Sequence, residues 1–189
     1  MWRGRPWLPR ICAALLALAN GGDGAMSVAA DIADAVNHYV GTSVSSSPDG
    51  RIPYNKTDVF LKRATAEGGR LVVETWTRSA PSPSMPPVVS VLRLTRRGES
   101  LEYDVVAEKG ARSGIVTFAS GALDRWTLDL DLGDGRRETG TGRISGAGVR
   151  VAKTVEGARP MRVVDELRAV SGEVYEREIA SMRPPKQAE

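Results

Sequence analysis

The chain has 189 residues, of which 26 are Lys or Arg, 23 are Asp or Glu and one is Cys. This length is typical of one domain with its own core, and a single cysteine excludes a fold held together by internal disulfides. The excess of basic residues lies within residues 1–19, which contain three arginines and no acids. Without them, 23 basic residues balance 23 acids, so composition gives no support for nucleic-acid binding.

The first residues have the pattern of a secretory signal peptide. Three arginines precede an uncharged apolar run at 11–18, and Ala17-Leu18-Ala19 forms a small-x-small cleavage site. A membrane-spanning helix needs about 20 apolar residues, so a permanent anchor is the less favoured alternative. We therefore expect residues 1–19 to be removed and the mature protein to be secreted or periplasmic, without stable membrane insertion. Cys12 leaves with the signal, so the mature chain has no thiol.

The next residues predict an arm and a short helix before the first strand. Residues 20–26 are glycine-rich and indicate a flexible arm. Residues 27–39 place apolar side chains at helical spacing, with Ser27 as a possible N-cap, so we expect a short amphipathic N-terminal helix. It would lie across the sheet or, alternatively, act as a lid. The Ser- and Gly-rich residues 41–54 predict a short edge strand and an ordered loop.

Most of the remaining chain alternates between apolar and polar residues. In 101–105 and 126–132 the period is two, which leaves the acids of each run on one face of its strand. The other, buried face carries Leu101, Tyr103 and Val105 in the first run and Trp126, Leu128, Leu130 and Leu132 in the second. Glycines punctuate these runs and favour hairpin turns. We predict ten strands, at 57–65, 70–78, 88–96, 100–107, 112–119, 124–132, 136–144, 148–156, 160–168 and 173–181.

The connections between these strands predict an all-β, antiparallel up-and-down meander. All but one are a few residues long, which leaves no room for a parallel crossover. The exception is the Pro-rich stretch 79–87, a surface loop. Closure into a barrel avoids two bare edges, and the glycines of 139–142 fit barrel corners; a two-sheet sandwich is the alternative. The domain would span 27–182, followed by a disordered tail at 183–189.

Two features suggest a ligand inside the barrel. Aromatic residues are few, so small and β-branched side chains would line the interior and leave space. The strand 136–144 carries polar side chains on both faces. Either the side chains of one face point into the barrel and need a partner there, or the strand is solvated on both sides. In the last predicted strand a phenol and a guanidinium share one face and would meet a carboxylate, unless Arg177 pairs with nearby glutamates. The candidate ligand-binding residues are Tyr175, Arg177, Tyr103, Trp126 and Arg143.

Residues 40–181 resemble the calycins, the lipocalin and fatty-acid-binding-protein group of small barrels. The resemblance lies in the order of signal, short helix, ten-strand meander and a tyrosine–arginine pair in the closing strand. Two motifs differ: this chain has Gly41-Thr42-Ser43 in place of the lipocalin Gly-x-Trp, and Tyr175-Glu176-Arg177 in place of Arg-x-Tyr. The resemblance implies an apolar ligand held inside a barrel.

Catalytic and metal-binding patterns are scarce. His38 is the only histidine, so a His-rich metal site cannot form. The chain has no Gly-x-Ser-x-Gly elbow, phosphate loop or dinucleotide fingerprint. We expect His38 to be a packing residue and the protein to have no cofactor, with His38 as an axial haem ligand as the alternative.

These observations favour a secreted or periplasmic, non-catalytic binding protein for a small apolar or amphiphilic molecule. The alternative is a structural or protein-interaction module of the cell envelope that docks a partner through an edge strand or the loop 79–87. An enzyme ranks third, because the sequence indicates no reaction.

Overall fold

The structure is a computed structural model that describes residues 37–66, 70–79, 82, 85–98, 100–109, 112–119, 122–145 and 148–182. In this part of the chain ten strands precede one helix. The strands are β1 (Asn37–Ser46), β2 (Pro53–Ala66), β3 (Arg70–Ser79), β4 (Val88–Arg96), β5 (Glu102–Ala107), β6 (Ser113–Ala119), β7 (Ala122–Gly133), β8 (Arg136–Ser145), β9 (Gly148–Glu156) and β10 (Met161–Val170), and the helix is α1 (Gly172–Ala180).

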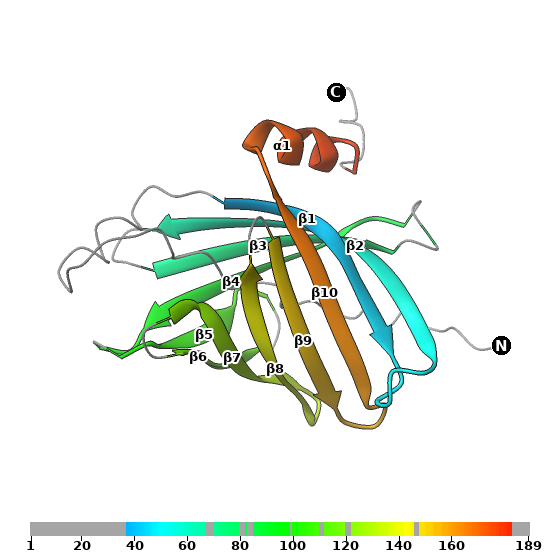
Figure 1. Cartoon of the computed structure of the whole chain (residues 1–189), viewed down its shortest axis with the longest axis vertical. Coiled ribbons are helices and arrows are strands. Elements are labelled where there is room, and N and C mark those ends of the chain that lie inside the picture. Colours follow the sequence, from blue (N-terminus) through cyan, green and yellow to red (C-terminus); the bar gives the residue numbers. More distant parts are fainter. Residues whose placement is uncertain are drawn as a thin grey trace.

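The ten strands form one closed antiparallel barrel. Each strand pairs with its neighbour in the chain, and β1 pairs with β10, which closes the sheet (Figure 1). This confirms the predicted all-β up-and-down barrel and excludes the two-sheet sandwich. The strand and ordered loop predicted within 41–54 are present as the end of β1 and the residues after Ser46, but β1 is paired on both sides, so its predicted edge position is wrong.

Alternation explains why these segments form strands. In β3, for example, Leu71, Val73, Thr75 and Thr77 are buried and the residues between them are partly exposed. The inward side chains of the other strands follow the same period and pack into one core. This core contains Tyr39, Val59, Leu61, Leu71, Val73, Leu92, Leu94, Tyr103, Val105, Ala107, Val116, Phe118, Trp126, Leu128, Leu130, Val149, Val151 and Leu167.

The last predicted strand, 173–181, is wrong, because these residues form α1. Ser171 caps the helix, and its side chain accepts a hydrogen bond from the backbone N–H of Val174. Tyr175 and Ile179, four residues apart and therefore on one helical face, are buried. The same two apolar residues also fit a period of two, which is why alternation alone misassigned the segment.

The missing tenth strand is β1. The helix predicted at 27–39 is wrong in its last three residues, which begin β1, while residues 27–36 lie outside the described residues. Within the described residues, the one helix therefore follows the barrel at its C-terminal end. The inward positions of β1 include Gly41, Ser43 and Ser45, so the strand lacks the apolar alternation that identified the others. The nine other predicted strands correspond to β2–β10.

Helix α1 packs on the outside of the barrel, next to β1 (Figure 1). Its buried residues meet outward-facing side chains of β1 and β2. This second apolar cluster contains Val40, Phe60, Tyr175, Ile179 and Met182, with Trp76 and Val170 partly buried against it. The helix therefore covers one apolar strip of the outer wall. The predicted signal peptide, arm and tail, at 1–19, 20–26 and 183–189, lie outside the described residues.

Candidate functional site

The structure brings two of the five sequence-predicted site residues together. Tyr103 and Trp126 both point into the barrel, and Phe118 lies between them, with ring centroids 5.5 Å from Tyr103 and 6.2 Å from Trp126. Arg143 lies on β8 and is exposed. Tyr175 and Arg177 lie on α1, outside the barrel.

The strand prediction required Tyr175 and Arg177 to share one face, but on the helix they do not. Tyr175 is fully buried beneath α1, with its ring centroid 4.8 Å from that of His38. Arg177 is exposed on the same helix. The phenol and the guanidinium therefore do not form the expected pair. His38 packs on the outer wall, beside the first residue of the helix.

A row of polar side chains crosses the inner wall of the barrel. Strand register places Trp126 opposite Gly142, Gly142 opposite Val151, Val151 opposite Asp165, and Asp165 opposite Ser43, which in turn faces Thr57. These residues belong to β7, β8, β9, β10, β1 and β2, and all occupy inward positions. We call the hydrogen-bonding members Trp126, Asp165, Ser43 and Thr57 the interior polar row.

Gly142 gives Trp126 its position in this row. A Cβ atom at Gly142 would lie 1.9 Å from Cε2 of the Trp126 indole and 2.4 Å from its Nε1. The indole therefore lies directly against the backbone of β8, an approach that only glycine allows. The Trp126 indole therefore covers Gly142, the next position of the row.

The interior polar row is buried but unsatisfied within the described residues. Ser43, Thr57 and Asp165 are 0% exposed and Trp126 is 2% exposed. No described protein group hydrogen-bonds Ser43 Oγ, Thr57 Oγ1, Asp165 Oδ1 or Trp126 Nε1. A buried polar group without a partner costs about 1–3 kcal/mol, and native proteins contain few of them. The row therefore has hydrogen-bonding capacity that the described residues leave unused.

A buried ion pair adjoins the row. Lys153 Nζ lies 2.5 Å from Asp165 Oδ2, and both side chains are 0% exposed. Glu138, on the neighbouring strand β8, is also buried, whereas Arg137 and Arg143 on that strand are exposed. Of the two polar faces predicted for 136–144, the one that carries Glu138 points inward. The pair therefore holds the Asp165 carboxylate in the interior.

Sequence reasoning missed Ser43, Thr57, Lys153 and Asp165. For Lys153 and Asp165 the sequence does contain a signal: each is a charged residue at a position of its strand where the alternation places apolar residues. Lys153 follows Val149 and Val151 at inward positions of β9, and Asp165 lies between Val163 and Leu167 on β10. Two opposite charges in core positions of adjacent strands predict a buried pair, because an isolated buried charge is too costly.

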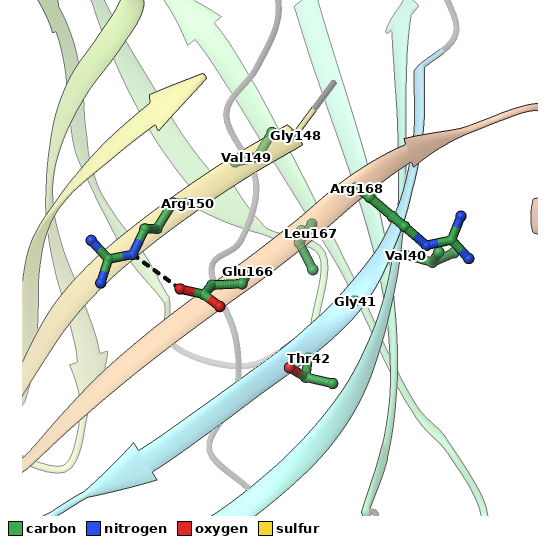
Figure 2. Close-up of a pocket in the computed structure, with 9 residues that line it drawn as sticks. All are labelled: Val40, Gly41, Thr42, Gly148, Val149, Arg150, Glu166, Leu167 and Arg168. Carbon is green, nitrogen blue, oxygen red and sulfur yellow. Dashed lines mark hydrogen bonds and ion pairs between the residues drawn. The ribbon is translucent and has the colours of Figure 1, made fainter. Parts of the chain in front are cut away.

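The outer wall also has a shallow groove, over β1, β10 and β9 (Figure 2). Its volume is about 450 Å³. Arg150 and Glu166 form an exposed ion pair there, with Nε 3.2 Å from Oε1. Arg168, also exposed, lies on the other side of the groove (Figure 2). Because the charged groups of the groove remain hydrated, they would contribute less binding free energy to a ligand than buried polar groups would.

The chain matches no protein-family model. Nor does any curated protein or solved structure match it. The described part of the chain contains no helix of the length and apolarity that crossing a membrane requires. Among the same residues, no three His, Cys, Asp or Glu side chains gather where a metal ion would bind.

We expect His38 to make the stability of the protein pH-dependent. Burial and the positive charge of Lys62 lower the pKa of His38 from its usual 6.5, while Glu176 raises it. The unfolded chain therefore takes up this proton at a higher pH than the folded chain. Stability from neutral His38 is complete above about pH 7 and falls as the pH drops through 6.5 toward the folded pKa.

The measurement is urea unfolding between about pH 5 and 8, the range in which histidine titrates. The variant His38→Phe keeps a ring against Tyr175 but cannot titrate, so it should lose less stability than the wild type on acidification. Identical pH profiles of the two proteins would contradict this prediction.

Proposed function

We propose that this protein is a non-catalytic binding protein for a small amphiphilic molecule, which it holds inside the barrel in a secreted or periplasmic location. The observation that carries the proposal is the interior polar row, in which four buried side chains have hydrogen-bonding atoms that no described protein group satisfies. A barrel that served only as a scaffold would gain stability from apolar residues at these positions.

The surroundings of the row support an amphiphilic ligand. The inner wall is otherwise mainly apolar, with Leu and Val from most strands and the aromatic side chains of Tyr103 and Phe118. An apolar tail against this wall and a polar head at the row would satisfy both surfaces. A closed ten-strand antiparallel meander is compatible with the calycins, and membership of that group is part of the proposal. The signal pattern of residues 1–19 is the basis for the location.

The proposal is tested by titration with N-phenylnaphthylamine, an uncharged apolar probe whose fluorescence rises in apolar surroundings. We expect saturable binding at one site per chain. Energy transfer from tryptophan should accompany it, because Trp126 lies on the inner wall. Absence of saturable binding would overturn the proposal.

Two matched valine substitutions locate the probe. Val73 is 1% exposed on the inner wall, whereas Val106 is 55% exposed on the outer wall. Val73→Phe should weaken probe binding because it fills interior space, and Val106→Phe should not change it. Equal effects of both variants would place the probe outside the barrel.

One observation favours the alternative of a docking module. Val44, Ile52 and Tyr54, near the connection between β1 and β2, are 39%, 61% and 54% exposed. Exposed apolar residues close together are typical of interaction surfaces. The closed barrel removes the predicted edge strand as a docking site. Self-association that Ile52→Asp abolishes, in a protein that does not bind the probe, would favour this alternative.

A further inference from the structure

We propose that the interior polar row binds a neutral hydroxyl group, so that the ligands are alcohols or polyols with an apolar part and not carboxylic acids. This inference rests on the proposed function, since it specifies the ligand chemistry of the same site. It follows from the donors and acceptors of the row and from the charges beside it.

The atoms of the row require a partner that both donates and accepts hydrogen bonds. The indole Nε1 of Trp126 can only donate, and the carboxylate of Asp165 can only accept. The hydroxyl groups of Ser43 and Thr57 can do either. Asp165, Ser43 and Thr57 occupy adjacent positions, so one ligand hydroxyl there can donate to the carboxylate and accept from a neighbouring hydroxyl group. An ammonium group donates only, so it cannot accept a hydrogen bond from the hydroxyl groups of Ser43 and Thr57.

The charges disfavour a carboxylate head group. The carboxyl groups of Asp165 and Glu138 and the ammonium group of Lys153 are all buried in the barrel. Lys153 Nζ already lies 2.5 Å from Asp165 Oδ2. A ligand carboxylate would place another acceptor next to that of Asp165 in a region screened from water, where repulsion between like charges is strong.

Burial makes this discrimination effective. Every member of the row is at most 2% exposed, so bulk water does not reach these atoms. A ligand without a hydroxyl group would therefore leave them without a hydrogen-bond partner. Sites built to hydrogen-bond a hydroxyl reject analogues that lack it much more strongly than apolar pockets reject a change in size. The site should therefore select by head group and tolerate variation in the tail.

The experiment is displacement of bound N-phenylnaphthylamine by three ligands with the same ten-carbon tail: decanol, decylamine and decanoate. All are used below the concentrations at which they form micelles. We expect decanol to bind about tenfold or more tightly than either charged ligand, on the scale of one hydrogen bond to a charged group. Equal or tighter binding of decanoate or decylamine would overturn the inference.

Two conservative variants test the row itself. Ser43→Ala and Thr57→Val remove hydroxyl groups that no described protein group satisfies, so they should not destabilise the ligand-free protein. Each should weaken decanol binding about five- to tenfold. The matched control is Thr75→Val. Thr75 is buried and also unsatisfied within the described residues, but it faces Leu61, four residues along β2 from Thr57, or about 13 Å away.

The outcomes separate the two proposals. If the probe binds but decanol binding is unaffected in Ser43→Ala and Thr57→Val, the row holds only water or nothing, and the hydroxyl inference fails while the binding function stands. If the probe and all three ligands fail to bind the wild-type protein, both proposals fail. Loss of decanol affinity in these two variants but not in Thr75→Val supports the assignment.

Discussion

Replacement of Asp165 by alanine should lower the free energy of unfolding by about 3–5 kcal/mol, because it leaves the Lys153 ammonium group buried without its counter-charge. Both side chains are 0% exposed, and Nζ lies 2.5 Å from Oδ2. Water cannot hydrate the unpaired ammonium group in the interior, whereas it would do so at the surface. For a domain of this size such a loss corresponds to a fall in melting temperature of about 10 °C.

The same two strands provide a matched control for Asp165→Ala. Arg150 on β9 and Glu166 on β10 form an ion pair on the outer face, with side chains 62% and 67% exposed. Glu166→Ala should change stability by at most about 1 kcal/mol, because both charges remain hydrated. The measurement is urea unfolding of both variants. A comparable loss in the two would show that burial does not govern the Lys153 pair.

A double replacement separates the value of the pair from the cost of breaking it. In Lys153→Met with Asp165→Leu, no charge is left unpaired, so most of the stability lost in Asp165→Ala should return. If the double variant is as unstable as Asp165→Ala, the pair itself contributes strongly to folding. If the interior polar row binds a hydroxyl group, this variant folds but no longer prefers decanol.

Replacement of Gly142 by valine should destabilise the protein by about 3 kcal/mol, the upper end of the range for overpacked cores. The first added carbon would lie 1.9 Å from the Trp126 indole, well inside van der Waals contact. The indole or strand β8 must therefore move, and Trp126 would lose its place in the interior polar row. Urea unfolding and the emission maximum of tryptophan report the two effects.

Thr141→Val is the control for Gly142→Val. Thr141 precedes Gly142 on β8 but is exposed, so the same side chain there should change stability by no more than about 0.5 kcal/mol. Trp126→Leu removes the ring that the new side chain would meet. The combined variant should therefore lose less stability than the sum of the single variants. Additive losses would mean that Gly142 is required for a reason other than contact with Trp126.

The sequence predicted the barrel well where local patterns carry the information. Nine of the ten strands and their antiparallel order follow from alternation and glycine turns, which depend on neighbouring residues only. It also placed Tyr103 and Trp126 on a buried face, as observed. The assignment failed at both ends of the described chain. There β1 lacks apolar alternation, and the buried pair Tyr175 and Ile179 fits a helix and a strand equally well.

The candidate site was much less predictable than the fold. Ser43, Thr57 and Asp165 are distant in the sequence and meet only because β1 pairs with both β2 and β10. Serine and threonine in a strand do not by themselves indicate a site, since most such residues are solvated. Only burial distinguishes these hydroxyl groups from those on the outer wall.

By itself, the sequence determined that the chain forms consecutive antiparallel strands, because alternation and turn chemistry are local properties. Only the tertiary structure decided that β1 closes the barrel against β10, that the C-terminal segment is a helix on the outer wall, and that Trp126, Asp165, Ser43 and Thr57 lie in one row. The physical reason is register, because hydrogen bonding between strands far apart in the chain fixes which side chains become neighbours. Exclusion of water then makes the interactions between those neighbours stronger than they would be at the surface.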